Sequence, residues 1–149
     1  MLNTKEIIDA IVQKHRRSGI DVYDSATVAE MVAFEEKIGF PLPKEFREFY
    51  SICNGFGCSK DIFNMLSLTQ IMHYSQDYGN DWFYFSEYMI YSDTWGLRLS
   101  SAKKYEIFNG SFPELVMTSS LLEFLNRYLK GNLFEVGGLY EWHEELGIK

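Results

Sequence analysis

The stretch GFPLPKEFREFYSICNGFG, residues 39–57, restricts the fold of this chain more than any other part of the sequence. Pro41 disfavours helix at the residue before it, whereas Pro43 suits the first turn of a new helix. Aromatic residues then repeat at helical spacing, and Asn54-Gly55 tolerates the left-handed geometry that stops a helix. The stretch therefore predicts a turn, a short core-packed helix and a sharp stop, and it holds no obvious catalytic group.

Helices are predicted on both sides of that stretch. Apolar residues at helical spacing indicate a first helix over about residues 4–17. Thr27 with Glu30 forms a capping-box pattern at the start of a second helix, and Ser120 with Glu123 does the same for a later one. The segment GLYEWHEELG predicts a short helix near the C-terminus.

Between these helices the composition favours strands. The segments WFYFSEYMIYSD, WGLRLS and KYEIF are rich in aromatic and β-branched residues. Asp93-Thr94 and Ser100-Ser101 read as the turns between them, so we expect an antiparallel meander. Helices first, a meander next and helices last predict an α+β fold, with helices packed against a mostly antiparallel sheet.

Length and composition set the class of protein. The chain has 149 residues, of which 46% are hydrophobic and 17% aromatic, which allows a real core and excludes the disordered class. The longest apolar runs fall far short of the roughly 20 residues needed to span a bilayer. The first residues lack the pattern of a signal peptide. We expect a single domain over residues 1–149, in the cytoplasm and without membrane contact.

Charge is distributed unevenly along the chain. The net charge is −7, and residues 61–97 contain no Lys or Arg. Because the phosphate backbone of nucleic acid is negative, DNA and RNA are poor partners, whereas a basic protein would be attracted. The acids of residues 61–97 are Asp61, Asp77, Asp81, Glu87 and Asp93.

Metal and disulfide chemistry find little support in the sequence. Cys53 and Cys58 fit a reducing compartment, where a buried Cys53 and a loop Cys58 are favoured over a disulfide between them. A structural zinc site needs about four ligands, and the three histidines lack ligand-type spacing. We expect no metal and no cofactor.

The sequence gives equally little support for a catalytic site. Glu35-Glu36 and Glu144-Glu145 are neighbours in sequence, and neighbours on a helix do not face each other. Cys53 with a distant histidine remains open as a thiol nucleophile, although a cysteine on an apolar helix face is more often inert packing. We therefore expect no catalytic residue and no enzymatic activity.

An aromatic segment suggests a protein-binding patch. Residues 74–95 contain nine aromatic rings among acidic side chains. Successive strand residues face opposite ways, so some rings should stay near the surface, where Tyr and Trp favour protein contacts. The alternative is that all the rings are core and the acids only solvate the sheet. The candidate partner-binding residues are Asp77, Asp81, Trp82, Glu87, Tyr88, Asp93 and Trp95.

The segment FEEKIGFPLPKEFREFYSICNGFG resembles the signature of the SUKH superfamily. The segments MLSLTQI, MIYSDTWGLRLS and SSLLEFLNRYL follow in the family's order, so the resemblance covers roughly residues 27–130. Two departures are the weak strand CSKDIFNML after Asn-Gly and the terminal GGLYEWHEELGIK, which matches no family element. The matching positions are Glu35, Gly39, Leu42, Pro43, Phe46, Tyr50, Asn54 and Gly55.

The resemblance implies both a fold and a function. Family members are α+β domains, and bacterial ones are similar to immunity proteins that bind a toxin domain, often a nuclease, and block it without chemistry. We therefore expect acidic and aromatic side chains to cover the active face of a basic toxin. The alternative is a regulatory interaction domain with an endogenous partner, like fungal relatives in cell-wall assembly. Exposed strand edges allow a monomer or a weak homodimer.

Overall fold

The computed structural model describes residues 3–17, 21–57, 63–73, 78–89, 93–101, 104–131 and 135–147. These residues form six helices and six strands, none of the helices long and apolar enough to cross a bilayer. In chain order the elements are α1 (Thr4–Arg17), β1 (Asp21–Val22), α2 (Val28–Ile38), α3 (Lys44–Ile52), β2 (Phe56–Gly57), β3 (Phe63–Met65), α4 (Leu68–His73), β4 (Trp82–Tyr88), β5 (Asp93–Ser101), β6 (Lys104–Asn109), α5 (Leu121–Gly131) and α6 (Leu139–Glu145).

The strands form one sheet in which each strand pairs with its neighbour in sequence. The order is β1-β2-β3-β4-β5-β6 and every pairing is antiparallel, which confirms the predicted α+β fold. The predicted turn positions were wrong. Asp93 pairs with Tyr88 and Ser101 pairs with Lys104, so both ends of β5 belong to the ladder. Sheet hydrogen bonds there outweigh the local turn preference of Asp and Ser.

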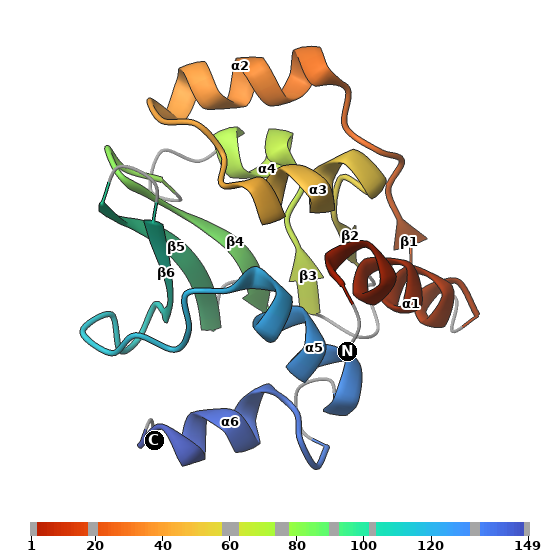
Figure 1. The fold of residues 1–149 in the computed structure, drawn as a ribbon, viewed down its shortest axis with the longest axis vertical. Coiled ribbons are helices and arrows are strands. Elements are labelled where there is room, and N and C mark those ends of the chain that lie inside the picture. Colours follow the sequence, from red (N-terminus) through yellow and green to blue (C-terminus); the bar gives the residue numbers. More distant parts are fainter. Residues whose placement is uncertain are drawn as a thin grey trace.

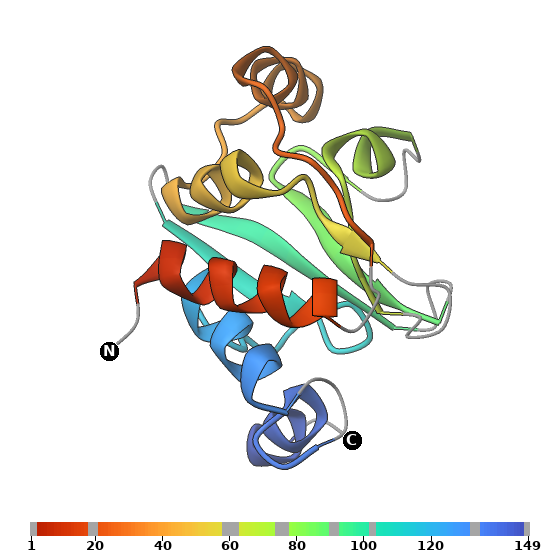
Figure 2. The ribbon, with the colours of Figure 1, turned by 90° about the vertical axis from the view of Figure 1, so that its right-hand side faces the viewer.

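Helices cover one side of this sheet. Figure 2 shows α1, α3 and α5 on the same side, while Figure 1 shows α2 and α6 farther out at opposite ends of the molecule. The buried side chains between helices and sheet form one hydrophobic cluster. At its centre, the Phe46 ring of α3 meets Phe83 and Phe85 of β4 edge-on, with ring centres 5.9 and 5.2 Å apart.

The turn between α2 and α3 is held by a carboxylate. The predicted capping box of Thr27 and Glu30 starts α2, and Gly39 ends it with a φ of 91°. Glu35 in the last turns of α2 accepts a hydrogen bond from the Leu42 backbone at 2.6 Å and another from Arg47 of α3. Because one carboxylate binds both the turn and the next helix, it sets the angle between α2 and α3.

The Asn-Gly end of α3 contacts the end of β3 and the start of α4. The Tyr50 hydroxyl donates to the Leu66 carbonyl at 2.9 Å, and the Asn54 amide oxygen accepts from the Leu68 backbone at the start of α4 at 3.0 Å. Gly55 has a φ of 94°, and a side chain there would come within 2.3 Å of the Met65 carbonyl oxygen. This stretch is therefore an architectural joint, as its sequence predicts.

A second joint links α3 to β6 and to the start of α5. The Glu45 carboxylate accepts hydrogen bonds from the Tyr105 hydroxyl of β6 and from the Leu121 backbone at the start of α5. A negative charge beside a helix N-terminus is favourable because the first N–H groups lack helical partners. Ser120 caps the same helix by accepting from the Glu123 backbone at 3.2 Å, as predicted.

The outer edge of the sheet at β6 is partly occupied. The Ile107 N–H donates to the Thr118 carbonyl at 2.7 Å, and the Met117 N–H donates to the Ile107 carbonyl at 2.8 Å. These bonds use backbone groups that would otherwise pair with another strand. Pairing of two copies through the middle of β6 is therefore disfavoured.

Candidate functional site: the open face of the sheet

An irregularity in β4 decides which of its side chains face the helices. The pairing with β5 shifts between Tyr84 and Ser86, so one residue is extra on β4. Phe83 and Phe85 face the helices, and beyond the shift Ser86 is buried opposite Trp95. Glu87, next along the strand, consequently faces the opposite side of the sheet, as Trp82 and Tyr84 do before the shift.

We call this opposite side of the sheet, which α1, α3 and α5 leave uncovered, the open face (Figure 2). It carries a different kind of side chain from the covered face. Half-buried rings lie beside polar and charged groups rather than among aliphatic ones. The side chains of the open face are Asn64, Trp82, Tyr84, Glu87, Thr94, Arg98, Glu106 and Phe108.

The predicted partner-binding residues do not form one patch. Asp81 is exposed and Trp82 is half-buried, and both border the open face. Glu87 belongs to that face too, but only 4% of it is exposed. Asp77, another candidate acid, lies outside the described residues.

Three candidates belong to the helix-covered side, so the structure does not bring the candidates together on one surface. Trp95 is 0% exposed, and its indole N–H donates to His143 Nε2 of α6 at 3.0 Å. The Tyr88 ring packs against Tyr140 of α6 with ring centres 6.3 Å apart. Asp93 accepts a hydrogen bond from the Tyr140 hydroxyl at 2.7 Å. Strand alternation after the shift turns these side chains toward α6, a contact that no local pattern reveals.

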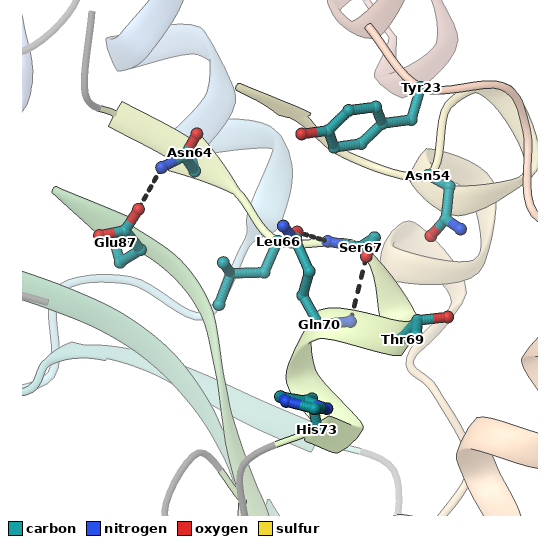
Figure 3. A pocket seen from close by; sticks show the side chains of 9 residues that line it. All are labelled: Tyr23, Asn54, Asn64, Leu66, Ser67, Thr69, Gln70, His73 and Glu87. Carbon is teal, nitrogen blue, oxygen red and sulfur yellow. Dashed lines mark hydrogen bonds between the residues drawn. The ribbon is translucent and has the colours of Figure 1, made fainter. Parts of the chain in front are cut away.

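The larger depression on the open face has a volume of about 600 Å³ and is called here the Glu87 hollow. Figure 3 shows Asn64 and Glu87 on one side of it, Asn54 and Thr69 on the other, with Tyr23 above and His73 below. The Asn64 amide donates a hydrogen bond to the Glu87 carboxylate, directly across the β3–β4 pair. The α4 wall is shaped by Ser67 and Gln70, which cap each other reciprocally.

The smaller depression, of about 300 Å³, is called the Trp82 hollow. Its rings are Trp82, Tyr84 and Phe108, with 5.0 Å between the first two ring centres. Arg98 lies over the Phe108 ring at 4.9 Å and pairs with Glu106 at 3.0 Å. The positive charge there is thus largely matched within the protein itself.

Glycines let these side chains lie flat on the sheet. A Cβ on Gly57 would come within 2.0 Å of the Asn64 amide, and one on Gly96 within 2.9 Å of the Phe108 ring. A Cβ on Gly110 would come within 2.1 Å of the Thr94 hydroxyl. Each glycine therefore makes room for a neighbouring side chain to fold across the backbone.

Cys53, His15 and His143, which were considered for catalysis, line neither hollow. Cys53 is 1% exposed, and burial raises the pKa of its thiol to about 11, which disfavours the reactive thiolate. Burial lowers the pKa of His15 to about 4 and also lowers the pKa of His143, so both favour the neutral form. No group of three or more metal-ligating side chains forms among the described residues, and Cys58 lies outside them.

Sequence reasoning missed several side chains of the open face and of the Glu87 hollow. The alternation Phe63-Asn64-Met65 is a usable signal, because a polar residue between two buried ones should face away from the core. Tyr23 has no such signal, since it follows a strand of only two residues. Phe108 was missed because it directly follows Ile107, and two apolar residues in succession do not show which of them faces the core.

Comparison with known proteins shows to which family the chain belongs. A search of curated proteins found no match to it. A model of the SMI1 / KNR4 family (SUKH-1) matches residues 25–146. That range corrects the interpretation of the C-terminal segment as foreign to the family, because it includes α6. The match spans most of the chain and agrees with the resemblance drawn from the stretch between Glu35 and Gly55, and the chain belongs to the SMI1 / KNR4 family of the SUKH superfamily.

Proposed function

We propose that this protein is a non-enzymatic binding module that neutralises a toxin domain by covering the toxin's active face. The open face of the sheet is the contact surface, and the observation that carries this proposal is its combination of two hollows with half-buried rings. Aromatic side chains that are partly exposed beside depressions are the usual anchors of protein interfaces.

Charge supports a basic partner. The net charge is −7, and the exposed Asp81 and the recessed Glu87 border the two hollows. Complementary charge speeds association and disfavours wrong partners. A nuclease binds a polyanion and therefore presents a basic active face, which an acidic surface would fit. Occlusion of that face needs no catalytic group in the inhibitor.

The test begins with affinity capture from the native cell, followed by expression of each captured protein in a laboratory bacterium. We expect one captured protein to stop growth, and this chain to restore growth when it is co-expressed. The double variant Asp81→Lys with Trp82→Ala should lose protection, because it changes the charge and a ring of the contact surface. Binding of the purified pair, measured by calorimetry, should weaken by at least about tenfold.

The matched control changes a surface charge elsewhere. Glu36 is exposed on α2, away from both hollows, so Glu36→Lys should retain protection and affinity. A captured partner that binds tightly but does not stop growth would favour the regulatory alternative. Equal loss of affinity in both variants would show that net charge, and not the open face, governs binding.

A further inference from the structure

The positive charge that lines the Trp82 hollow is already engaged within the protein. Arg98 forms an ion pair with Glu106 at 3.0 Å and donates a hydrogen bond to the Pro113 carbonyl. Its guanidinium also lies over the Phe108 ring, which is only 5% exposed. Because these contacts occupy both the charge and that ring, neither is the part of the hollow that a partner would use.

The rings of Trp82 and Tyr84 remain half-buried at the surface. Their centres are 5.0 Å apart, with 64° between the ring planes. Both rings lie close against glycines, since a Cβ on Gly79 would come within 2.1 Å of Trp82 Nε1 and one on Gly110 within 3.2 Å of the Tyr84 hydroxyl. Rings held in this way lose little freedom when a partner binds, which lowers the entropic cost of the contact.

Asp81 supplies the charge of the hollow that is not matched. It lines the rim, is exposed, and forms no ion pair or side-chain hydrogen bond with another residue that the structure describes. Since the positive charge of Arg98 is offset by Glu106, the negative charge of Asp81 is left over. Charge complementarity therefore selects a cation, and the faces of aromatic rings attract cations as well.

We propose that the Trp82 hollow receives an arginine side chain of the partner protein, with the guanidinium against the Trp82 ring and the Asp81 carboxylate. This inference rests on the proposed function, because it requires a partner protein that covers the open face. Arginine suits the hollow better than lysine, since a planar guanidinium stacks on a ring and binds a carboxylate through two N–H groups. The volume of about 300 Å³ is at the lower end for ligand pockets and suits one side chain.

The experiment titrates the isolated protein with N-acetyl-arginine amide and follows the Trp82 indole N–H and the backbone amides of Tyr84 and Gly110 by NMR. N-acetyl-citrulline amide is the matched probe, because it has almost the same shape and no charge. N-acetyl-lysine amide carries the charge without the planar group. We expect saturable shifts at all three positions, and binding of the arginine amide at least about fivefold tighter than that of the citrulline amide.

The three probes also state what would contradict the proposal. The lysine amide should bind more weakly than the arginine amide, because it cannot stack or bind the carboxylate through two groups. Equal binding of the arginine and citrulline amides, or no shifts around the hollow, would overturn the proposal. Tighter binding of the lysine amide would overturn the choice of arginine.

Variants locate the groups that bind the probe. Asp81→Asn keeps the shape and removes the charge, whereas Trp82→Leu removes the ring, and each should weaken binding of the arginine amide by at least about threefold. Glu36→Gln removes the same charge from an exposed position on α2 and should leave the affinity unchanged. Equal weakening in Asp81→Asn and Glu36→Gln would mean that the general acidity of the protein, and not the hollow, attracts the probe. A heteronuclear spectrum of each variant establishes that it is folded.

Failure of this inference can be separated from failure of the proposed function. If the chain protects against a captured toxin yet binds the arginine and citrulline amides equally, only the assignment of the hollow is wrong. If the chain discriminates between these amides but no captured partner is toxic, the hollow stands and toxin neutralisation is wrong.

Discussion

The two faces of one strand, β4, carry different kinds of aromatic side chain. Phe83 and Phe85 are fully buried against α3 and its neighbours, whereas Trp82 and Tyr84 are half-buried on the open face. Four rings in succession thus separate into core and surface without any change in composition. The aromatic content of a segment therefore says little about binding until the alternation of the strand assigns each ring to one face of the sheet.

The largest expected effect comes from the covered face. Phe83→Ala removes a ring that contacts Phe34, Phe40 and Phe46, and we expect a loss of about 3–5 kcal/mol in the free energy of unfolding. Tyr84→Ala, one residue away, should lose only about 1 kcal/mol because its ring is half exposed. Urea unfolding measures both. Equal losses would remove the distinction between the faces.

Acid should also weaken the covered face. Burial lowers the pKa of His15 from 6.5 to about 4, and the charge of Lys14 contributes to a smaller extent. Between these two pH values the unfolded chain therefore binds a proton at His15, whereas the folded chain does not. Stability from this residue is complete above pH 6.5 and falls by about 3 kcal/mol as the pH drops toward 4. Urea unfolding at a series of pH values should show this slope.

Two variants assign that slope to His15. His15→Gln should flatten stability between pH 6.5 and pH 4, even if it lowers stability throughout. The exposed His73, at the rim of the Glu87 hollow, provides the control, and His73→Gln should leave the slope in place. A slope that survives in His15→Gln would point to His143 as the main cause.

A smaller loss of stability is expected from a substitution beside the open face. Gly96→Ala would place a methyl group 2.9 Å from both the Phe83 carbonyl oxygen and the Phe108 ring, so we expect a loss of about 1–3 kcal/mol. Ser100→Ala, an exposed position on the same strand, should change stability by less than about 0.5 kcal/mol. Thermal unfolding compares them, and a neutral Gly96→Ala would show that Phe108 moves aside freely.

The smallest effect is expected at the rim of the Trp82 hollow. Asp81 is exposed, so Asp81→Asn should change the free energy of unfolding by less than about 0.5 kcal/mol. Chemical denaturation of the wild type and the variant gives this difference. A large loss would mean that this rim supports the fold, and it would remove Asp81 as a clean probe of binding.

Local signals in the sequence were sufficient for most elements. The capping pairs at Thr27 and Ser120 start α2 and α5 as expected, because a capping side chain satisfies backbone groups at the start of its own helix whatever the tertiary structure. Gly39 likewise ends α2 for a local reason, whereas α3 ends at Cys53 in extended backbone, two residues before the left-handed Gly55. The family resemblance, which depends on these same residues, was confirmed.

The arrangement of the open face required long-range information. The extra residue at Tyr84–Ser86 has no sequence marker, and without it Glu87 would face the helices and Tyr88 the open side. The position of the half-buried Asp93 depends on Tyr140, 47 residues later, in a segment to which the sequence assigned no role. The same two facts explain why the predicted patch divides between the faces.

The Glu45 carboxylate has a consequence for how the chain matures on the ribosome. Its partners, Tyr105 and Leu121, are synthesised 60 and 76 residues after it. Until they emerge, the first three helices have a charged group at their margin with only water to bind. The first three helices therefore cannot complete the native hydrogen bonds of Glu45 until β6 and the start of α5 have been synthesised.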